Sequence, residues 1–292
     1  MKPEFNKGLI LTSLGSFWWG FIGVIYFQYV SFIGHVELVV HRCLWTAVML
    51  ILTTTFLSKW KIFLKIIKIK KKLIFLFISG LLIFINWAIW IYAVATERII
   101  DASFGYFIMP IISVLLGKIF FNEELNNKRI FAIFLVLISI LILIFFSLKS
   151  LPWVGLIVAL SWAFYNLVRK KINVDTDVGL LIESLFILPF ALIVFYLIIK
   201  SGLNDFNISS PGLSLFLILA GPMTVIPLFL YVRGVELIGL GPTGMIFYLT
   251  PTLQFILGYF YYNEDFSLVK LISFIIIWIA VIIYLKDLYE TN

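Results

Sequence analysis

The sequence has little of what metal sites, redox sites and soluble enzymes require. Its 292 residues include a single cysteine, Cys43, and two histidines, and only 13% of them are charged. One cysteine excludes an intrachain disulfide and a CxxC motif, and two histidines are too few for a histidine-rich metal site. HExxH, GxSxG and P-loop motifs are missing, and no GxGxxG motif follows a predicted strand. We therefore expect no enzyme activity, no metal, no cofactor and no ATP hydrolysis by this chain alone.

Apolar residues, by contrast, are in large excess. They make up 63% of the chain, which is more apolar surface than one soluble domain of this length can bury. A membrane-spanning helix needs about 20 apolar residues, so the chain has room for roughly ten spans and no soluble domain. The runs are apolar on all sides, which favours helices over transmembrane strands. We predict an all-α integral membrane protein with ten transmembrane helices, near residues 8–30, 36–57, 73–95, 101–121, 129–147, 152–168, 177–199, 212–232, 241–261 and 267–285.

The distribution of Lys and Arg predicts the orientation in the membrane. With the N-terminus in the cytoplasm, seventeen of the 22 Lys and Arg residues fall on the cytoplasmic side, four fall outside, and Arg42 lies within a span. This asymmetry follows the positive-inside rule and places both termini in the cytoplasm. Topology thus explains the net charge of +7, and no nucleic-acid partner is expected. The densest basic segment, Lys59 to Lys72, is interleaved with apolar residues and is compatible with a short amphipathic helix on the inner leaflet; a plain topogenic loop is the favoured interpretation, and a regulatory role is the alternative.

Two stretches indicate that the chain contains one unit twice. Residues 107–124 read FIMPIISVLLGKIFFNEE, and residues 248–265 read YLTPTLQFILGYFYYNED, with shared Pro, Gly, Asn and Glu positions offset by 141 residues. With five spans each, the two units, 1–149 and 150–292, enter the membrane in opposite senses. We predict two inverted five-helix repeats, an architecture of secondary transporters whose substrate sites lie near the midplane where the halves meet.

Ionisable residues inside spans are costly in lipid, so each is a candidate for function. Glu37 and His41 lie one turn apart in the second span, next to Arg42, and Glu183 lies in the seventh span. At the repeat offset, Arg42 corresponds to Glu183. We predict that Arg42, Glu37 and His41 line the outer part of a path, and that Glu183, on the inner part, holds a cationic substrate or a proton. The structural alternative is that Arg42 pairs with Glu37 or a loop carbonyl, while Glu183 bonds neighbouring hydroxyls.

Polar and aromatic residues within spans form a second group of candidates. In a bilayer such side chains face a neighbouring helix or a wet cavity rather than lipid. An aromatic pocket with a carboxylate would suit an organic cation. Interfacial anchoring and helix–helix packing are the alternatives. The candidates for contact with substrate are Trp19, Asn86, Trp87, Trp90, Tyr106, Tyr165, Asn166, Thr224, Tyr248 and Gln254.

Prolines inside the predicted spans indicate bent helices. Each proline removes a backbone hydrogen bond and kinks its helix. Lipid tolerates this where a neighbouring helix or a cavity satisfies the freed carbonyl. We predict gating or hinge roles for Pro110, Pro222, Pro227 and Pro251, with a plain packing role as the alternative.

Eight stretches, in order along nearly the whole chain, carry a resemblance to a known family. They read KGLILTSLGSFWWG (7–20), ELVVHRCLWT (37–46), NWAIWIYAV (86–94), DASFGYFIMP (101–110), LSWAFYNLVRKK (160–171), GLLIESLFILP (179–189), GPMTVIPLF (221–229) and TPTLQFILGYFYYNEDF (250–266). Together they resemble the RarD-type subfamily of EamA permeases, within the drug/metabolite transporter superfamily.

This resemblance implies a fold, a location and an activity. It implies ten helices in two inverted repeats, a bacterial inner membrane, and transport of small organic solutes without ATP. The family's pattern includes His41-Arg42, Asn86-Trp87, Glu183 and the run from Pro251 to Phe255. The chain departs from that pattern at three positions, which are Asp101, Asn122 and Asn263.

We therefore expect a secondary transporter that works by alternating access. The resemblance and the candidate residues suit an organic cation, an amino-acid-like metabolite or a drug as the solute, with proton coupling as one option. A passive channel or facilitator is the alternative, and a non-transporting membrane partner is disfavoured because the chain has no room for a soluble signalling domain. The expected partners are the solute and membrane lipid. The chain is expected to be a monomer or a homodimer, with its fifth and tenth spans at the periphery.

Overall fold

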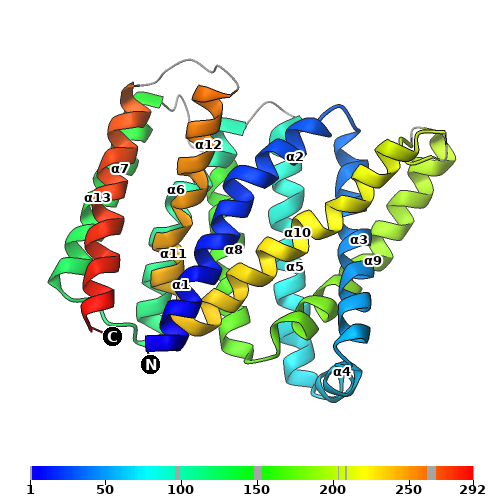
Figure 1. Cartoon of the computed structure of the whole chain (residues 1–292), viewed down its shortest axis with the longest axis horizontal. Helices are drawn as coiled ribbons and strands as arrows, with labels where there is room; N and C mark the ends of the chain where they lie inside the picture. Colours follow the sequence, from blue (N-terminus) through cyan, green and yellow to red (C-terminus); the bar gives the residue numbers. More distant parts are fainter. Residues whose placement is uncertain are drawn as a thin grey trace.

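The protein is built from helices. The computed structural model describes residues 2–95, 99–147, 153–202, 204–207, 209–261 and 268–291. Throughout these ranges the chain forms helices joined by short connections, and no strand occurs in them (Figure 1). The prediction of an all-α protein is confirmed. Residues 262–265, which close the second copy of the repeated stretch and include Asn263, lie outside the described ranges, and of Asp101 only the backbone is described.

The first span of the first half is interrupted by a π-helical segment, and the last helix of this half lies at the edge of the molecule. They are α1 (Lys2–Phe17), the π-helical segment η1 (Trp18–Ile22), α2 (Gly23–Tyr29), α3 (His35–Phe56), the short α4 (Trp60–Ile67), α5 (Lys70–Ala95), α6 (Ile99–Phe121) and α7 (Asn127–Ser147).

The helices of the second half follow the same order, except that the ninth predicted span is divided. They are α8 (Trp153–Ile172), α9 (Thr176–Ser201), α10 (Pro211–Ile238), α11 (Leu240–Phe247), α12 (Leu249–Phe260) and α13 (Leu268–Thr291).

Helices cover each of the predicted spans, but not all of them have the length and composition of a membrane-crossing helix. In the described part of the chain, seven helices are long and apolar enough to cross a membrane, and Gly105–Phe121 is a shorter apolar helix. Two predicted spans, the sixth and the ninth, belong to neither group, and the structure shows why. The last turn of α8 carries Arg169, Lys170 and Lys171, and the ninth span is split between α11 and α12.

The first and ninth spans are both interrupted, and the interruptions lie side by side. In the first span, η1 widens the helix at Trp18–Ile22, a feature often found at functional sites. The ninth span breaks at Tyr248, three residues before Pro251, whose ring excludes a regular turn there. Thr250 donates a hydrogen bond to the Ser16 carbonyl (3.0 Å), which joins the two breaks. By contrast, Pro110, Pro222 and Pro227 lie within continuous helices.

The basic segment between the second and third spans forms a short helix, α4. Its Ile66 is buried against α5 and α9, while Ile62 and Leu64 are exposed apolar residues on its outer side. Just before α4, Lys59 donates hydrogen bonds to Asp175 (3.0 Å) and Asp177 (2.8 Å). Burial alone would lower the pKa of Lys59, but these two carboxylates outweigh it and the pKa is raised.

Helices of the two halves pack against one another in a regular scheme. Helix α1 packs along α10, and α5 packs along α8; α3 contacts α10, and α5 contacts α9. Three further pairs join the corresponding helices of the two halves: α3 with α9, α6 with α11, and α7 with α13. The crossing of α1 and α10 is close because Gly15 meets the backbone at Pro227 and Tyr231, where a Cβ atom would lie 3.0 Å from a carbonyl oxygen.

The α7–α13 pair forms one edge of the molecule (Figure 1). Its buried side includes Val136, Ile140, Ile277 and Ala280, which join a cluster with residues of α6 and α11. Its other side is apolar and exposed, with Phe145 at 77%. The fifth and tenth spans thus lie at the periphery, and they support the rest of the molecule through α6 and α11.

Candidate functional site

Glu183 is completely buried and holds three side-chain partners. Its Oε1 accepts hydrogen bonds from Ser79 Oγ (2.5 Å) on α5 and from Arg169 Nη1 (3.3 Å) on α8, and its Oε2 accepts one from the Tyr165 hydroxyl (3.2 Å). The side chains of Glu183 and Arg169 are 3% and 1% exposed. The carboxylate is therefore neutralised by a buried ion pair and linked to both halves of the chain.

Arg169 extends this charge network toward α10. Its Nη2 donates to the Thr176 carbonyl (3.1 Å) and lies 3.9 Å from Glu236 Oε1. Gly179 makes room for the guanidinium, because a Cβ atom there would lie 1.9 Å from Nη1. In the sequence, Arg169 was grouped with the basic loop that follows the sixth span, and it was therefore missed. A signal was present: Tyr165 and Arg169 are one turn apart, which places them on the same helix face.

Arg42 is the second buried charge, and its surroundings differ. Its Nε donates to Thr224 Oγ1 (3.2 Å) on α10, and its Cζ lies 4.9 Å from the ring centroids of both Phe27 and Trp87. No carboxylate of the described residues lies within 4.0 Å of the guanidinium. The predicted pairing alternatives, with Glu37 or with a loop carbonyl, do not occur among these contacts.

Glu37 and His41 face a different part of the structure from Arg42. The Glu37 carboxylate accepts hydrogen bonds from the backbone N–H groups of Asp205 (2.9 and 3.0 Å) and Phe206 (3.2 Å), which fastens the connection between α9 and α10. The His41 ring packs on Phe206, and its Nδ1 accepts a hydrogen bond from the Trp45 indole (3.1 Å). The sequence placed all three residues on one path, whereas the structure separates Glu37 and His41 from Arg42.

An aromatic cluster fills the centre of the molecule between the two charges. Trp19 on η1 contacts Trp162, Tyr231 and Phe247 with centroid separations of 5.2, 5.8 and 6.2 Å. Trp162 stacks on Tyr165 at 5.5 Å, so the cluster reaches the Glu183 network. On the other flank, Tyr106 contacts Phe247 (5.7 Å) and Trp90 (5.5 Å).

Three members of this cluster, Trp162, Tyr231 and Phe247, were not among the predicted site residues. Trp162 lies one turn from Tyr165 and Asn166, and Phe247 precedes Tyr248, so each is next to a predicted residue in sequence. An apolar ring inside an apolar run gives no signal of its own. Trp162 could have been predicted from its spacing, because it lies one helical turn from Tyr165 and Asn166 and so shares their helix face.

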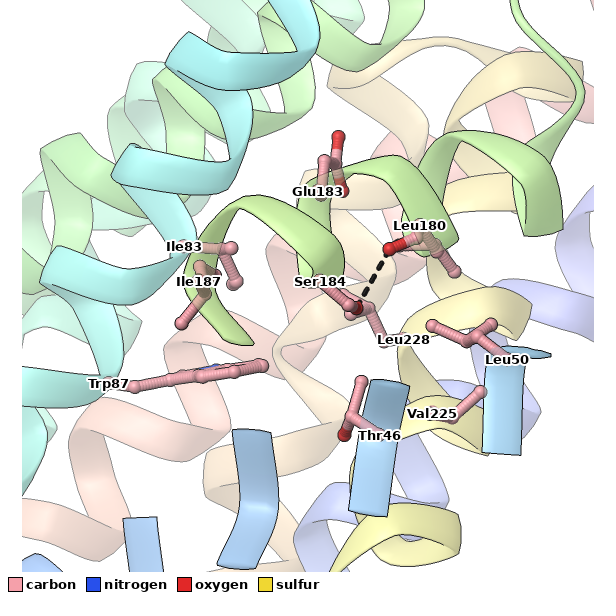
Figure 2. Close-up of a pocket in the computed structure, with 10 residues that line it drawn as sticks. All are labelled: Thr46, Leu50, Ile83, Trp87, Leu180, Glu183, Ser184, Ile187, Val225 and Leu228. Carbon is pink, nitrogen blue, oxygen red and sulfur yellow. Dashed lines mark hydrogen bonds between the residues drawn. The ribbon is translucent and has the colours of Figure 1, made fainter. Parts of the chain in front are cut away.

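A small cavity lies between the two charges. It has a volume of about 10 Å³, the space of roughly one water molecule. Glu183 lines one end, Thr46 lies one turn beyond Arg42 on α3, and Trp87 contacts both the cavity and the Arg42 guanidinium. Figure 2 shows the Glu183 carboxylate turned away from Thr46 and Ser184. The Thr46 hydroxyl is buried without a partner.

The remaining predicted polar residues mostly join helices. Asn86 donates from its amide nitrogen to the Val158 carbonyl and to Ser161 Oγ, both at 3.0 Å, which links α5 to α8. Asn166 donates to the Trp162 carbonyl (3.0 Å), and its own amide oxygen is buried without a partner. The Tyr248 hydroxyl donates to the Phe107 carbonyl (2.7 Å). Gln254 is half-buried on α12.

Metal chemistry finds no support in the described part of the chain. Within those residues, no group of three or more His, Cys, Asp or Glu side chains is placed to hold a metal ion. Cys43 is buried, at 3% exposure, and lies beside Arg42 in sequence. Within the described residues, the polar centre consists of the Glu183–Arg169 ion pair, the Arg42 guanidinium without a carboxylate partner, and the aromatic cluster between them.

Comparison with known proteins gives consistent matches along the whole chain. A family model described as the EamA-like transporter family matches twice, over residues 6–145 and 150–286. Protein RarD of Salmonella typhi is 33% identical over 287 residues, which cover 98% of this chain and 97% of that protein. An uncharacterized transporter of Bacillus subtilis, YojE, is 33% identical over 284 residues, 96% of this chain and 94% of that protein. One solved crystal structure, 14% identical, covers 95% of this chain and 96% of that chain with a TM-score of 0.68, a likeness of fold alone.

Proposed function

This chain belongs to the EamA-like transporter family, and we propose that it is a secondary active transporter of a small organic solute that works by alternating access. The family and the many apolar helices make it a multi-pass bacterial membrane transporter. The proposal adds ten membrane crossings arranged as two inverted five-helix repeats, 1–149 and 150–292. The observation that carries it is the pair of buried charges, Arg42 and Glu183, at equivalent positions of the two repeats.

The packing scheme supports inverted repeats. A two-fold axis between the halves would exchange each helix for its counterpart about 141 residues away. It would then convert the packed pair α1–α10 into the pair α8–α5, and the pair α3–α10 into the pair α9–α5. Both exchanged pairs are observed, and the pairs α3–α9, α6–α11 and α7–α13 map onto themselves. A two-fold axis in the membrane plane produces this pattern, and it is typical of secondary transporters.

A single hydrogen bond supports the position of that axis. Tyr248 donates to the carbonyl of Phe107, and these two residues are separated by 141, the repeat offset. Equivalent residues can touch only where they approach the axis relating them. The two stretches that identify the repeat therefore meet at the centre of the proposed symmetry.

The central cluster supports a carrier rather than an open channel. Its aromatic rings come from both halves, and the neighbouring cavity, lined by Trp87, Glu183 and aliphatic side chains, has space for about one water molecule. In alternating access a closed centre of this kind opens to one side at a time, and the halves rock around the site. Gating or hinge roles for Pro110, Pro222, Pro227 and Pro251 are part of this proposal, as is contact of the solute with the aromatic cluster.

Transport in proteoliposomes tests the proposal. A thermal-shift screen of the purified chain against metabolites and drugs first identifies a stabilising solute, because a ligand of the folded state raises its stability. Saturable counterflow of that solute, with stimulation from the opposite side, is expected of a carrier. Unsaturable flux or electrical conductance would instead support the channel alternative. If Glu183→Gln leaves transport and its pH dependence unchanged, Glu183 has no part in coupling.

Location and orientation are also part of the proposal. We place the protein in the bacterial inner membrane with both termini in the cytoplasm, in line with the Lys and Arg distribution. A reporter fused to the C-terminus that is active only in the cytoplasm is expected to be active. Activity of a reporter that works only outside the cytoplasm would reverse the orientation.

A further inference from the structure

Arg42 is a buried cation that lacks a counter-ion. It is 9% exposed, and among the described residues its only hydrogen bond runs from Nε to the Thr224 hydroxyl, which is a neutral acceptor. Its electrostatic neighbours are Cys43, Tyr106 and Tyr26, none of them a carboxylic acid. Removing a guanidinium from water costs several kcal/mol unless an anion compensates. Within membrane helices, such unpaired charges mark ligand sites.

The nearby acids are occupied by other groups. Glu37 lies five residues before Arg42 on the same helix, yet its two oxygens accept the backbone N–H groups of Asp205 and Phe206 at 2.9–3.2 Å. Glu183 is neutralised by Arg169 at 3.3 Å. Releasing either carboxylate toward Arg42 would leave other buried donors unsatisfied. The missing anion therefore has to come from outside the described part of the chain.

The geometry around the guanidinium defines the shape of that anion. The rings of Phe27 and Trp87 lie 4.9 Å from Cζ, and Nε is bonded to Thr224, which leaves the two Nη groups as free donors. Two parallel Nη donors match the two oxygens of a carboxylate. The ring of Trp87 continues into the small cavity, which is lined mostly by Leu, Ile and Val side chains.

We infer that Arg42 binds the carboxylate of a small organic monoacid, whose apolar body lies against Trp87, Tyr106 and the aromatic cluster. The inference deepens the proposed transport function and rests on it. One positive charge in an apolar site is neutralised by one negative charge. A phosphate dianion would bring a second, uncompensated charge, and an organic cation at this site would find no unpaired carboxylate among the described residues around it.

A binding experiment on the detergent-purified full chain tests this inference without requiring transport. The probes are benzoate, phenylacetate and hexanoate, each compared with its matched neutral amide, together with inorganic phosphate and tetraethylammonium. We expect each carboxylate to raise the thermal midpoint in a concentration-dependent manner, and its amide, phosphate and tetraethylammonium to have no such effect. Stabilisation by phosphate or tetraethylammonium beyond that by the carboxylates would overturn the inference. The inference would also be overturned if acids and amides stabilised the chain equally, or if neither stabilised it.

Substitutions of Arg42 test whether carboxylate binding depends on this side chain. Arg42→Gln is expected to abolish stabilisation by the carboxylates, and Arg42→Lys, which keeps the charge but loses the planar fork, to weaken it by about tenfold or more. The control Lys128→Gln removes an exposed positive charge at the α7–α13 edge and is expected to bind like the unmodified chain. Unchanged carboxylate binding in Arg42→Lys and Arg42→Gln would refute the site. If Arg42→Gln does not fold, Arg42→Lys alone tests the site, and unchanged carboxylate binding in that variant would refute it.

The outcomes separate this inference from the proposed function. Carboxylate binding that depends on Arg42, without counterflow in proteoliposomes, would retain the site and contradict the carrier. Counterflow of another solute that is insensitive to Arg42→Lys would retain the carrier and contradict the site.

Discussion

Glu183 and Arg42 lie one repeat offset of 141 residues apart, but among the described residues only Glu183 has a charged partner. Glu183 is bonded to Arg169, Ser79 and Tyr165, so each of its oxygens is satisfied. A buried pair of this kind contributes little net stability, because desolvating two charges offsets their attraction. Removing one member has a larger effect, because it leaves the other charge buried and uncompensated.

We predict that Glu183→Gln destabilises the folded protein by about 3 kcal/mol, because Arg169 then keeps a buried charge whose nearest described carboxylate, that of Glu236, lies 3.9 Å from Nη2. The expected observation is a marked fall in the thermal midpoint of the purified chain. In the double variant Glu183→Met with Arg169→Met both charges are absent, and we expect most of that loss to be recovered.

Comparing the thermal stability of Glu183→Gln with that of the double variant shows whether the ion pair causes the loss. Arg233→Gln is a suitable control, since Arg233 is 42% exposed and pairs with Glu236 at the rim of the same network. It is expected to change stability by about 1 kcal/mol or less. If the double variant is as unstable as Glu183→Gln, the ion pair is not the source of the effect.

Single charges in apolar runs could be predicted from the sequence, and their partners could not. Arg42 and Glu183 were identified because a charge is costly in lipid. Arg169 was missed because Lys170 and Lys171 follow it, so all three were assigned to a loop. The bond from Glu37 to the amide of Asp205 joins residues 168 positions apart, and only the tertiary structure brings them together.

At the scale of helices, the junction of α10 and α11 depends on a residue from the other half. Gly239 ends α10 with a φ of 95°, a conformation that favours glycine. The first amides of α11 are then free to bond, and Glu123 accepts them: Leu240 N and Gly241 N both lie 2.8 Å from its carboxylate. Lys170 adds a third bond at 2.9 Å. A carboxylate at a helix N-terminus also complements the helix dipole.

We predict that Glu123→Gln loosens the start of α11, because the neutral amide keeps one acceptor oxygen and loses the charge. Hydrogen exchange of the Leu240 and Gly241 amides is expected to accelerate by about tenfold, in line with the loss of a charged cap worth about 1 kcal/mol or more. The measurement is exchange followed by mass spectrometry on peptides that cover α11.

Glu124→Gln provides the matched control for the α11 junction. Glu124 is the neighbouring acid, its side chain is exposed, and it takes part in the structure through its carbonyl, which accepts from Arg129 at 2.8 Å. Its variant should leave exchange at α11 unchanged. Equal acceleration in both variants would point to net charge rather than to the cap.

The spans themselves could be predicted because hydropathy is a local property of the chain, and helices cover every predicted range. The interruptions of helices were harder to locate. The π-helical turn at Trp18–Ile22 has no proline, and apart from Ser13 and Ser16 the residues next to it are apolar or glycine. Pro251 correctly indicated an irregular ninth span, whereas Pro222 and Pro227 lie in a continuous α10. Proline removes one hydrogen bond, and packing decides whether the helix also breaks.

At the scale of the whole molecule, several polar contacts join the two halves on the side that carries both termini (Figure 1). Lys59 binds Asp175 and Asp177, and Glu123 binds Lys170. The pKa of Lys59 is raised, so its contribution is complete below the unfolded-state pKa, about 10.4, and is lost only as the pH rises through the folded-state value. These contacts are therefore intact at neutral pH. The sequence repeat predicts two inverted halves, but it does not predict on which side of the membrane they close.

We predict that the double variant Lys59→Gln with Lys170→Gln opens the termini side more often. Lys59 pairs with two carboxylates and Lys170 with one, and each part-exposed pair is worth about 1 kcal/mol or less. Losing all three shifts the opening equilibrium by up to about a hundredfold. The reporter is Ser184→Cys at the central cavity, introduced after the native Cys43 is replaced by serine. Its labelling by a small, membrane-impermeant methanethiosulfonate is expected to accelerate, because opening admits the reagent.

The same reporter in a Lys128→Gln background separates closure from general loosening. Lys128 also joins the halves, through Asp287 (3.6 Å) and Glu290 (3.4 Å), but it does so at the α7–α13 edge, away from the core. Labelling of the Ser184→Cys thiol should therefore stay at the rate of the unmodified background. Equal acceleration in both backgrounds would mean that the halves separate as a whole. No acceleration in the double variant would show that these contacts do not hold the termini side closed.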